Sequence, residues 1–198
     1  MESIVLRSFK KAHVLRLLVL TVGFLASQVL TPSDGNAQDA RVAKSMAALQ
    51  EATSKLGAPK IDGKEAVGGR DAPALYFGST KMNNNFSVVD AVAEEGGRGM
   101  AVTLFVRSGG DYIRVATNVS TRVAGGRGLG TILTGPALES IKVGNPYYGK
   151  APVLGTPYIG GYEPIKDQRA QSSVFILSGI RSEPFNMLHC PKVFTRSF

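Results

Sequence analysis

Residues 100–117, MAVTLFVRSGGDYIRVAT, decide the fold class because they predict a β-hairpin. Residues 100–106 and 112–117 are β-rich runs, and the five residues between them include two adjacent glycines. Two such runs joined by a short glycine-containing loop are typical of antiparallel strands. Alternation along the second run predicts one face formed by Tyr112, Arg114 and Ala116 and another formed by Ile113, Val115 and Thr117.

Arg114 is the residue of this hairpin that bears most on function. A charged residue in the middle of an apolar strand either faces solvent or pairs with a partner on the buried side. Strand alternation in an antiparallel sheet allows both placements, so both interpretations stay open. If Arg114 faces a pocket, its guanidinium can hold a carboxylate through two charge-assisted hydrogen bonds.

Beyond the hairpin the chain predicts three more strands and a short helix. Proline at the first turn and glycine just after the end indicate the helix, and β-rich runs separated by a Leu-Gly-Thr link and a polar turn indicate the strands. The elements are a helix at 136–143 and strands at 147–153, 157–165 and 174–180.

Two tyrosines flank a glycine on one face of the strand at 157–165. Tyr158, Gly160 and Tyr162 share that face because side chains alternate along a strand. The glycine either leaves space for a small ligand beside two hydroxyls or marks a bulge or close backbone packing. Tyrosines in a half-buried sheet also serve as core residues, and both interpretations stay open.

Two helices are predicted before the hairpin. Residues 39–56 place Val42, Met46, Leu49 and Leu56 at helical spacing, with a glycine and a proline after the end. A second helix begins near Ser87, where Ser-Val-Val-Asp matches a capping box. The three asparagines at 83–85 suit cap and turn chemistry or donation to a ligand. Residues 58–74 contain glycine and proline with few large apolar side chains, so they predict a covering loop.

The first 37 residues predict a secretory signal peptide. Lys10, Lys11 and Arg16 precede a mainly apolar stretch of 14 residues at 17–30, and Gly-Asn-Ala at 35–37 provides a small-residue cleavage site after Ala37. The alternative is an uncleaved membrane anchor, but 14 helical residues span only about 21 Å of a hydrocarbon core of roughly 30 Å. The expected location is therefore the periplasm or the exterior.

Composition and motifs argue against several classes of function. The chain has a net charge of +8, but its basic residues between Arg41 and Arg196 are scattered singly, so no nucleic-acid partner is expected. One cysteine, Cys190, and two histidines, His13 and His189, near opposite ends of the chain argue against structural zinc and Cys/His catalysis. The glycine-rich residues 119–131 lack the Lys-Ser/Thr of a phosphate cradle and predict a mobile hairpin loop. We expect no enzymatic activity and no cofactor.

Together these elements predict an α+β domain: a central antiparallel sheet of about five strands, with a long N-terminal helix and short helices packed on it. Residues 38–181 form the domain, and 182–198 form a divergent or poorly ordered tail.

The chain resembles the single Cache domain, a PAS-like extracytoplasmic sensor module, in its Cache type 3/type 2 fusion form. The resemblance covers residues 40–180, nearly all of the chain beyond the signal peptide. Its most specific block contains Gly155, Pro157, Tyr158, Tyr162, Glu163, Pro164, Ile165, Lys166 and Asp167. FVRSGGDYIRVATNV and GLGTIL upstream contribute to it.

The resemblance implies a PAS-like sheet and a pocket for a small molecule, commonly a short organic acid. The candidate ligand-binding residues are Arg114, Tyr112, Tyr158, Tyr162 and Lys166. Because no second transmembrane helix or output domain is visible in the sequence, we expect signalling through a membrane sensor partner. The alternative is an interaction module whose pocket is filled by its own side chains. The sequence predicts no particular oligomeric state.

Overall fold

The computed structural model describes residues 34–121, 126–166 and 172–182. Residues 1–33 of the predicted signal peptide lie outside these residues, as does the tail after Ser182, whereas the predicted cleavage site after Ala37 falls within the first helix. The helices are α2 (Asp34–Leu56), α3 (Ser87–Gly96) and α4 (Pro136–Lys142). The strands are β1 (Pro59–Val67), β2 (Arg70–Phe77), β3 (Thr80–Lys81), β4 (Met100–Ser108), β5 (Asp111–Thr117), β6 (Tyr147–Val153), β7 (Thr156–Lys166) and β8 (Ser172–Arg181).

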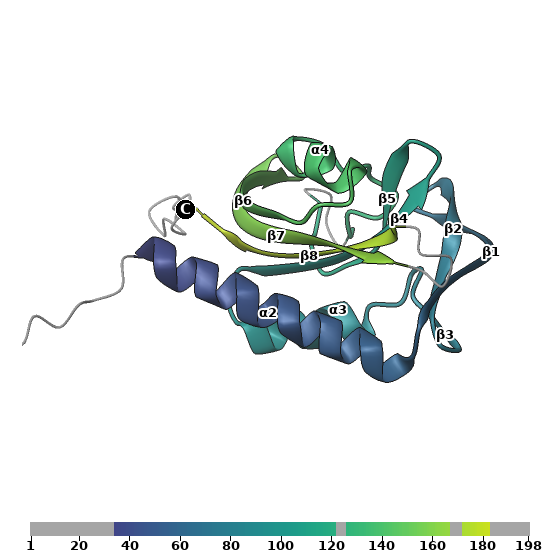
Figure 1. Ribbon diagram of the computed structural model, residues 1–198, viewed down its shortest axis with the longest axis horizontal. Coiled ribbons are helices and arrows are strands. Elements are labelled where there is room, and N and C mark those ends of the chain that lie inside the picture. Colours follow the sequence, from purple (N-terminus) through teal and green to yellow (C-terminus); the bar gives the residue numbers. More distant parts are fainter. Residues whose placement is uncertain (1–33, 122–125, 167–171, 183–198) are drawn as a thin grey trace, which may run out of the picture. The chain divides into compact units, whose positions relative to one another are not determined.

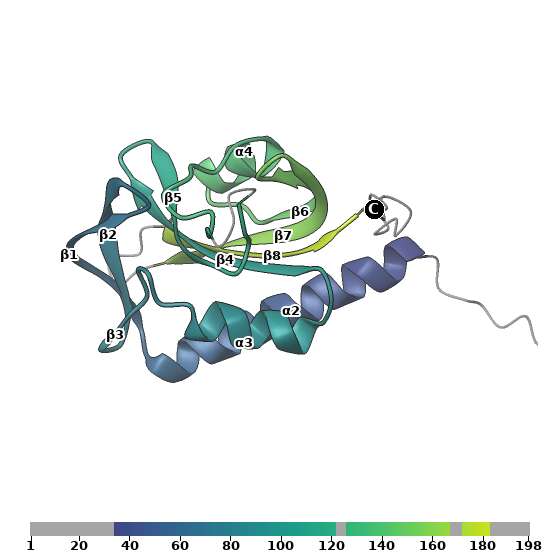
Figure 2. The same ribbon diagram turned by 180° about the vertical axis from the view of Figure 1, so that it is seen from behind.

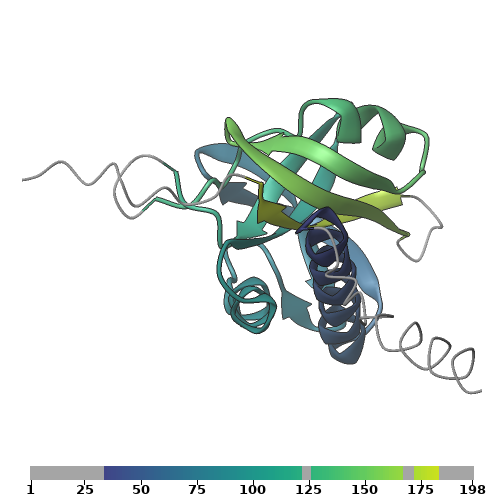
Figure 3. The same ribbon diagram turned by 90° about the vertical axis from the view of Figure 1, so that its left-hand side faces the viewer.

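A five-stranded antiparallel sheet forms the centre of the domain, in the order β5-β4-β8-β7-β6. The helices α2 and α3 cover one face and α4 covers the other (Figures 1 and 2). Seen along the axis of α2, α3 lies beside it beneath the sheet (Figure 3). The predicted α+β class, its PAS-like sheet and its long N-terminal helix are therefore confirmed, although the helix begins at Asp34 rather than Asp39.

The core has two layers, one on each face of the sheet. On the helical face, Val42, Met46 and Leu49 of α2 are buried, as their spacing predicts. α2 packs on β7 and β8, and α3 packs on β4 and β5. Each such side chain contributes roughly 1.5–3 kcal/mol on burial. On the other face, Ala137 and Ile141 of α4 pack in a cluster with Phe105 and with tyrosines of β5 and β7. This second layer contains the candidate site.

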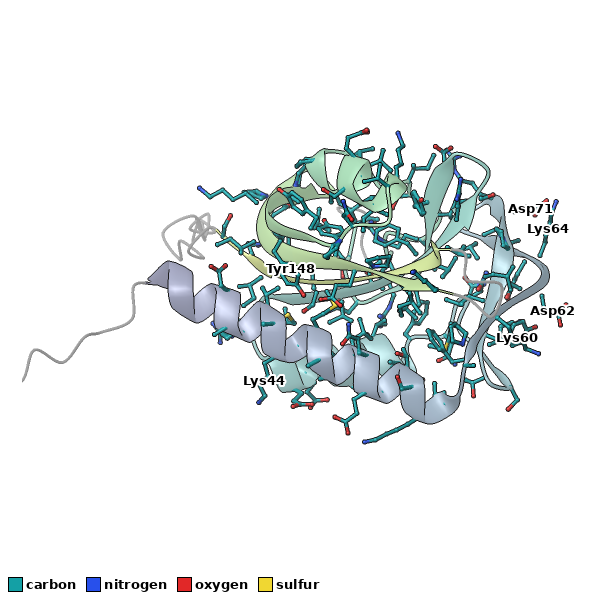
Figure 4. The ribbon with its side chains drawn as sticks, viewed as in Figure 1. Lys44, Lys60, Asp62, Lys64, Asp71 and Tyr148 are labelled. Atoms are coloured by element: carbon teal, nitrogen blue, oxygen red, sulfur yellow. The ribbon has the colours of Figure 1, made fainter. Side chains whose placement is uncertain are left out.

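Residues 58–74 form a hairpin, so the prediction of a covering loop is wrong. β1 and β2 pair through a two-residue turn at Gly68 and Gly69, whose φ angles of 57° and 81° fit a type I′ turn. Gly63 lies where the register shifts between Ile61 and Lys64. The glycines therefore mark a turn and a bulge. The charged residues Lys60, Asp62, Lys64 and Asp71 project outward from this hairpin (Figure 4).

The predicted capping box at Ser87 is also wrong. Phe86 is the N-cap residue of α3 and makes no side-chain cap hydrogen bond. Ser87 instead donates from its amide and its hydroxyl to Asn85 Oδ1. Asn83 is buried and bonds to the backbone of β2 through both ends of its amide. The asparagines thus stabilise the turn before α3 and hold it against the backbone of β2.

A bulge at Val115 changes the predicted faces of β5. Leu104 pairs with Ala116 and Phe105 with Arg114, so Val115 has no partner of its own on β4. Val115 and Ala116 both face the α2 layer, and Thr117 returns to the α4 face, where its hydroxyl bonds to that of Thr103 at 2.7 Å. The predicted faces hold from Tyr112 to Val115 and fail for Ala116 and Thr117.

Candidate ligand site around Arg114

Arg114 lies on the α4 face of β5 with only 4% of its surface exposed. The two placements that the sequence left open are thus resolved in favour of the buried one. Its Nη1 donates to Thr131 Oγ1 at 2.8 Å and to the Gly128 carbonyl at 3.4 Å, and the guanidinium lies over the Phe105 ring, 5.0 Å from its centroid. Burial lowers the pKa of Arg114 to about 10.

The Arg114 guanidinium has no acidic partner among the residues that the structure describes, and its Nε has no hydrogen-bond partner there. Buried arginines are normally paired with a carboxylate, because an isolated charge in a low-dielectric site is costly. The site therefore contains a positive charge that no described carboxylate balances, and the guanidinium can still donate a hydrogen bond from Nε.

Residues 127–133, which follow β5 in the chain, fold back along that strand and cover Arg114. We call them the covering segment. Arg114 exchanges backbone hydrogen bonds of 2.9 Å with Thr131 and Gly130, and the Leu133 amide donates to the Tyr112 carbonyl at 2.9 Å. Gly128 leaves room for the guanidinium: a Cβ there would lie 2.9 Å from Arg114 Nη1 and 2.5 Å from Leu154 Cδ1. The tip of this glycine-rich loop, 122–125, lies outside the described residues.

A cavity of about 250 Å³ adjoins Arg114. Its lining combines Arg114, Tyr162 and Thr134 with apolar side chains of the covering segment, of β6 and of the β6–β7 turn: Ile132, Leu133, Pro152 and Leu154. Tyr162 is buried, which raises the pKa of its hydroxyl to about 12. The arrangement suits a small ligand with one anionic group and a short apolar body.

Comparison with known protein families agrees with this geometry. A family model described as the Cache 3/Cache 2 fusion domain matches residues 25–175. The chain belongs to this family. No curated protein matches the sequence. Cache domains are extracytoplasmic small-molecule sensor domains that bind ligands rather than catalyse reactions and typically feed signalling receptors.

In this Cache domain, four of the five candidate residues lie in one layer. Arg114 and Tyr162 line the cavity, and Tyr112 and Tyr158 belong to the same buried cluster as Tyr162. Lys166 is exposed at the far end of β7 and does not line the cavity. Its position in the motif block therefore does not bring it to Arg114.

Sequence reasoning missed Thr131, Leu154 and Tyr147. Thr131 and Leu154 come from segments that meet Arg114 only after folding, although GLGTIL had already marked the first of them as part of the resemblance. Tyr147 is the cross-strand partner of Tyr162, and the two rings meet edge to face at 6.0 Å. The adjacent Tyr147-Tyr148 pair at the start of β6 was the available signal.

Two further observations bear on chemistry and location. Among the described residues, no group of three or more His, Cys, Asp or Glu side chains is placed to hold a metal ion. His13, His189 and Cys190 lie outside those residues. No helix in the described part of the chain is long and apolar enough to cross a membrane.

Proposed function

We propose that this protein is an exported Cache sensor that binds a small organic acid at Arg114. The observation that carries the proposal is the buried guanidinium without an acidic partner among the described residues. A bound carboxylate would supply the missing opposite charge. Each charge-assisted hydrogen bond that it formed would contribute roughly 1.5–3 kcal/mol.

The cavity favours a ligand of a few carbon atoms with a single carboxylate. Arg114 is the one cation among its described lining residues, its volume is about 250 Å³, and Leu133, Pro152 and Leu154 provide apolar walls. A second carboxylate on the ligand would be desolvated without an opposite charge among these lining residues, which is unfavourable. We therefore favour monocarboxylates over dicarboxylates of similar size.

The family supports a location outside the cytoplasm, and the N-terminal residues supply the means of export. In this proposal the signal peptide is cleaved after Ala37, and the domain presents its ligand state to a membrane sensor partner. Mass spectrometry of the exported protein tests the first part. A mature chain that begins at Gln38 supports cleavage, whereas retention of residues 17–30 supports the anchor.

Thermal unfolding of the purified protein, with and without ligand, tests the binding function. The panel contains formate, acetate, propanoate, butanoate, lactate, pyruvate, succinate and neutral amides of the same sizes. A monocarboxylate at 100 times its dissociation constant adds about 2.7 kcal/mol, which raises Tm by roughly 5–10 °C for a domain of this size. The amides lack the charge and should give no shift.

Two substitutions identify the anchoring residue. Arg114→Met removes the guanidinium from the cavity, and Arg107→Met makes the same change at an exposed position of β4. The carboxylate shift should disappear in the first variant and persist in the second. Loss in both variants, or persistence in both, would contradict the assignment. A folded protein that responds to no compound would favour an interaction module whose pocket is filled.

A further inference from the structure

A second and larger cavity lies at the end of the sheet where β4 and β7 begin and β8 ends. Its volume is about 800 Å³, within the range of ligand-binding clefts. The strands meet there through the pairs Met100–Ile180 and Tyr158–Arg181. Among the described residues that line it, only Leu154 also lines the cavity of Arg114. The two cavities are therefore adjacent but are lined by largely different residues.

The floor of this cleft is apolar. Ala101, Val153, Tyr158 and Ile180 line it, and each of these residues is at most 7% exposed. They belong to the core of the domain, so the cleft reaches down to buried carbon atoms. A ligand seated there would cover apolar surface of the kind that stabilises binding by its removal from water.

The rim of the cleft is basic. Arg41, Arg98 and Arg181 line it, all three are exposed, and no aspartate or glutamate occurs among the described lining residues. None of the three forms a salt bridge within the described part of the chain. Arg41 Nη2 donates to the carbonyls of Gly96 at 2.6 Å and Arg98 at 3.2 Å, which holds that side chain in place without neutralising it.

We propose that this cleft binds an anionic amphiphile, with its apolar body on the floor and its acidic head at the arginine rim. An alkyl carboxylate of about eight carbons or an aromatic sulfonate has this chemistry. The C-terminal segment 183–198 is a poorer occupant, because it carries Lys192 and Arg196 against a single acidic side chain, Glu183. Charge complementarity therefore favours an acidic ligand.

Fluorescence of 8-anilinonaphthalene-1-sulfonate, which has an apolar body and one negative charge, tests the proposal on the purified protein. Octanoate should displace the probe at concentrations at least ten-fold lower than octan-1-ol or octylammonium at the same ionic strength. Shortening octanoate to hexanoate and butanoate should weaken displacement by about three- to four-fold per methylene. Equal displacement by octanol or octylammonium would overturn the requirement for an acidic head.

Matched charge removal locates the site. Arg98→Ala with Arg181→Ala removes two rim charges, and Arg70→Ala with Arg107→Ala removes two exposed charges that do not line the cleft. The first double variant should weaken probe binding by ten-fold or more with an unchanged Tm, and the second should leave binding within two-fold. Equal effects of the two double variants would overturn the proposal.

Arg114→Met distinguishes ligand binding in this cleft from ligand binding in the proposed acid site at Arg114. The variant should lose the response to short monocarboxylates and keep the binding of the sulfonate probe. Loss of probe binding in Arg114→Met, with retention in the rim variant, would place the amphiphile in the smaller cavity and contradict a second site. Absence of probe binding by the full chain would contradict it as well.

Discussion

The Arg127 guanidinium binds the Asp90 carboxylate through two hydrogen bonds, Nη1 to Oδ1 at 2.6 Å and Nη2 to Oδ2 at 2.9 Å. Arg127 also donates to the Thr117 carbonyl at 2.8 Å and lies 4.2 Å from the centroid of the Phe86 ring. Asp90 belongs to α3, whereas Arg127 begins the segment that covers Arg114. This pair therefore fastens the cover of the candidate site to the helical layer.

Asp90→Asn should loosen that cover at a modest cost in stability. Both side chains are partly exposed, so the loss should be about 0.5–1 kcal/mol, or roughly 1–4 °C in Tm. Hydrogen exchange should accelerate at the Gly128 and Gly130 amides, which donate to Val119 and Arg114. Glu94→Gln removes an exposed carboxylate from the same helix and should change neither quantity. Equal exchange rates in the two variants would contradict the fastening role.

Arg114→Met should leave the unfolding free energy of the ligand-free protein unchanged or higher. An apolar side chain of similar length removes the cost of a buried unpaired charge, although it also loses the bond to Thr131. Urea unfolding measures the difference. Arg114→Lys keeps the charge but loses the planar fork, so it should be less stable than Arg114→Met. A large loss of stability in Arg114→Met alone would indicate a structural role for the guanidinium.

The difference in unfolding free energy between wild type and Arg114→Met should depend on pH in a defined direction. Burial lowers the pKa of Arg114 from its usual, much higher value to about 10, so below pH 10 the group is charged in both the folded and the unfolded state. The cost of the buried charge is then fully present, and it falls only as pH rises above about 10. The difference between wild type and Arg114→Met should therefore be constant from pH 6 to 9.

Local patterns predicted most of the central sheet, because its strands are β-rich runs bounded by glycine-containing or polar turns. β1 and β2 escaped prediction since their glycines form a turn and a bulge within a paired hairpin, which composition alone does not distinguish from a loop. The bulge at Val115 leaves no mark in the sequence, because Val and Ala fit either face of a strand. It is determined by pairing with β4.

The candidate site was predictable only in part, for a related reason. Strand alternation placed Arg114 on the same face as Tyr112 and Tyr158 on the same face as Tyr162, but it did not show which faces were buried. Thr131, Gly128 and Leu154 reach Arg114 through tertiary pairing of the covering segment and the β6–β7 turn. No periodicity encodes such a contact. Lys166 shows the converse, since it belongs to the motif but lies on the surface.

Tyr162→Phe should remove a tyrosine whose hydroxyl ionises only at unusually high pH. Burial raises the pKa of Tyr162 to about 12, against a usual 10, so the folded state keeps this proton while the unfolded state releases it. The resulting stabilisation is present below pH 10 and is lost as pH rises through 12. Absorbance at 295 nm should lose a component near pH 12 in Tyr162→Phe. A preserved component would contradict the burial of this hydroxyl.

Gly68→Ala should destabilise the domain far more than Gly69→Ala. Both glycines have positive φ angles, so each substitution carries the backbone cost of about 1 kcal/mol. A Cβ at Gly68 would also lie 2.2 Å from the Leu129 carbonyl oxygen, whereas one at Gly69 meets nothing within 4 Å. Urea unfolding should show a difference of about 1–3 kcal/mol between the variants. Equal losses would mean that the hairpin turn does not pack on the covering segment.

Gly128→Ala should reduce ligand binding by steric means alone. The added Cβ would lie 2.9 Å from Arg114 Nη1 and 2.5 Å from Leu154 Cδ1, so one of these side chains must shift within the cavity wall. Gly110→Ala makes the same change in the β4–β5 turn, where a Cβ meets nothing within 4 Å. We expect monocarboxylate affinity to fall at least ten-fold in Gly128→Ala and by less than two-fold in Gly110→Ala, measured by calorimetry. Neither substitution changes a charge. A loss of affinity in Gly128→Ala alone would therefore show that the geometry around the guanidinium, as well as its charge, determines binding.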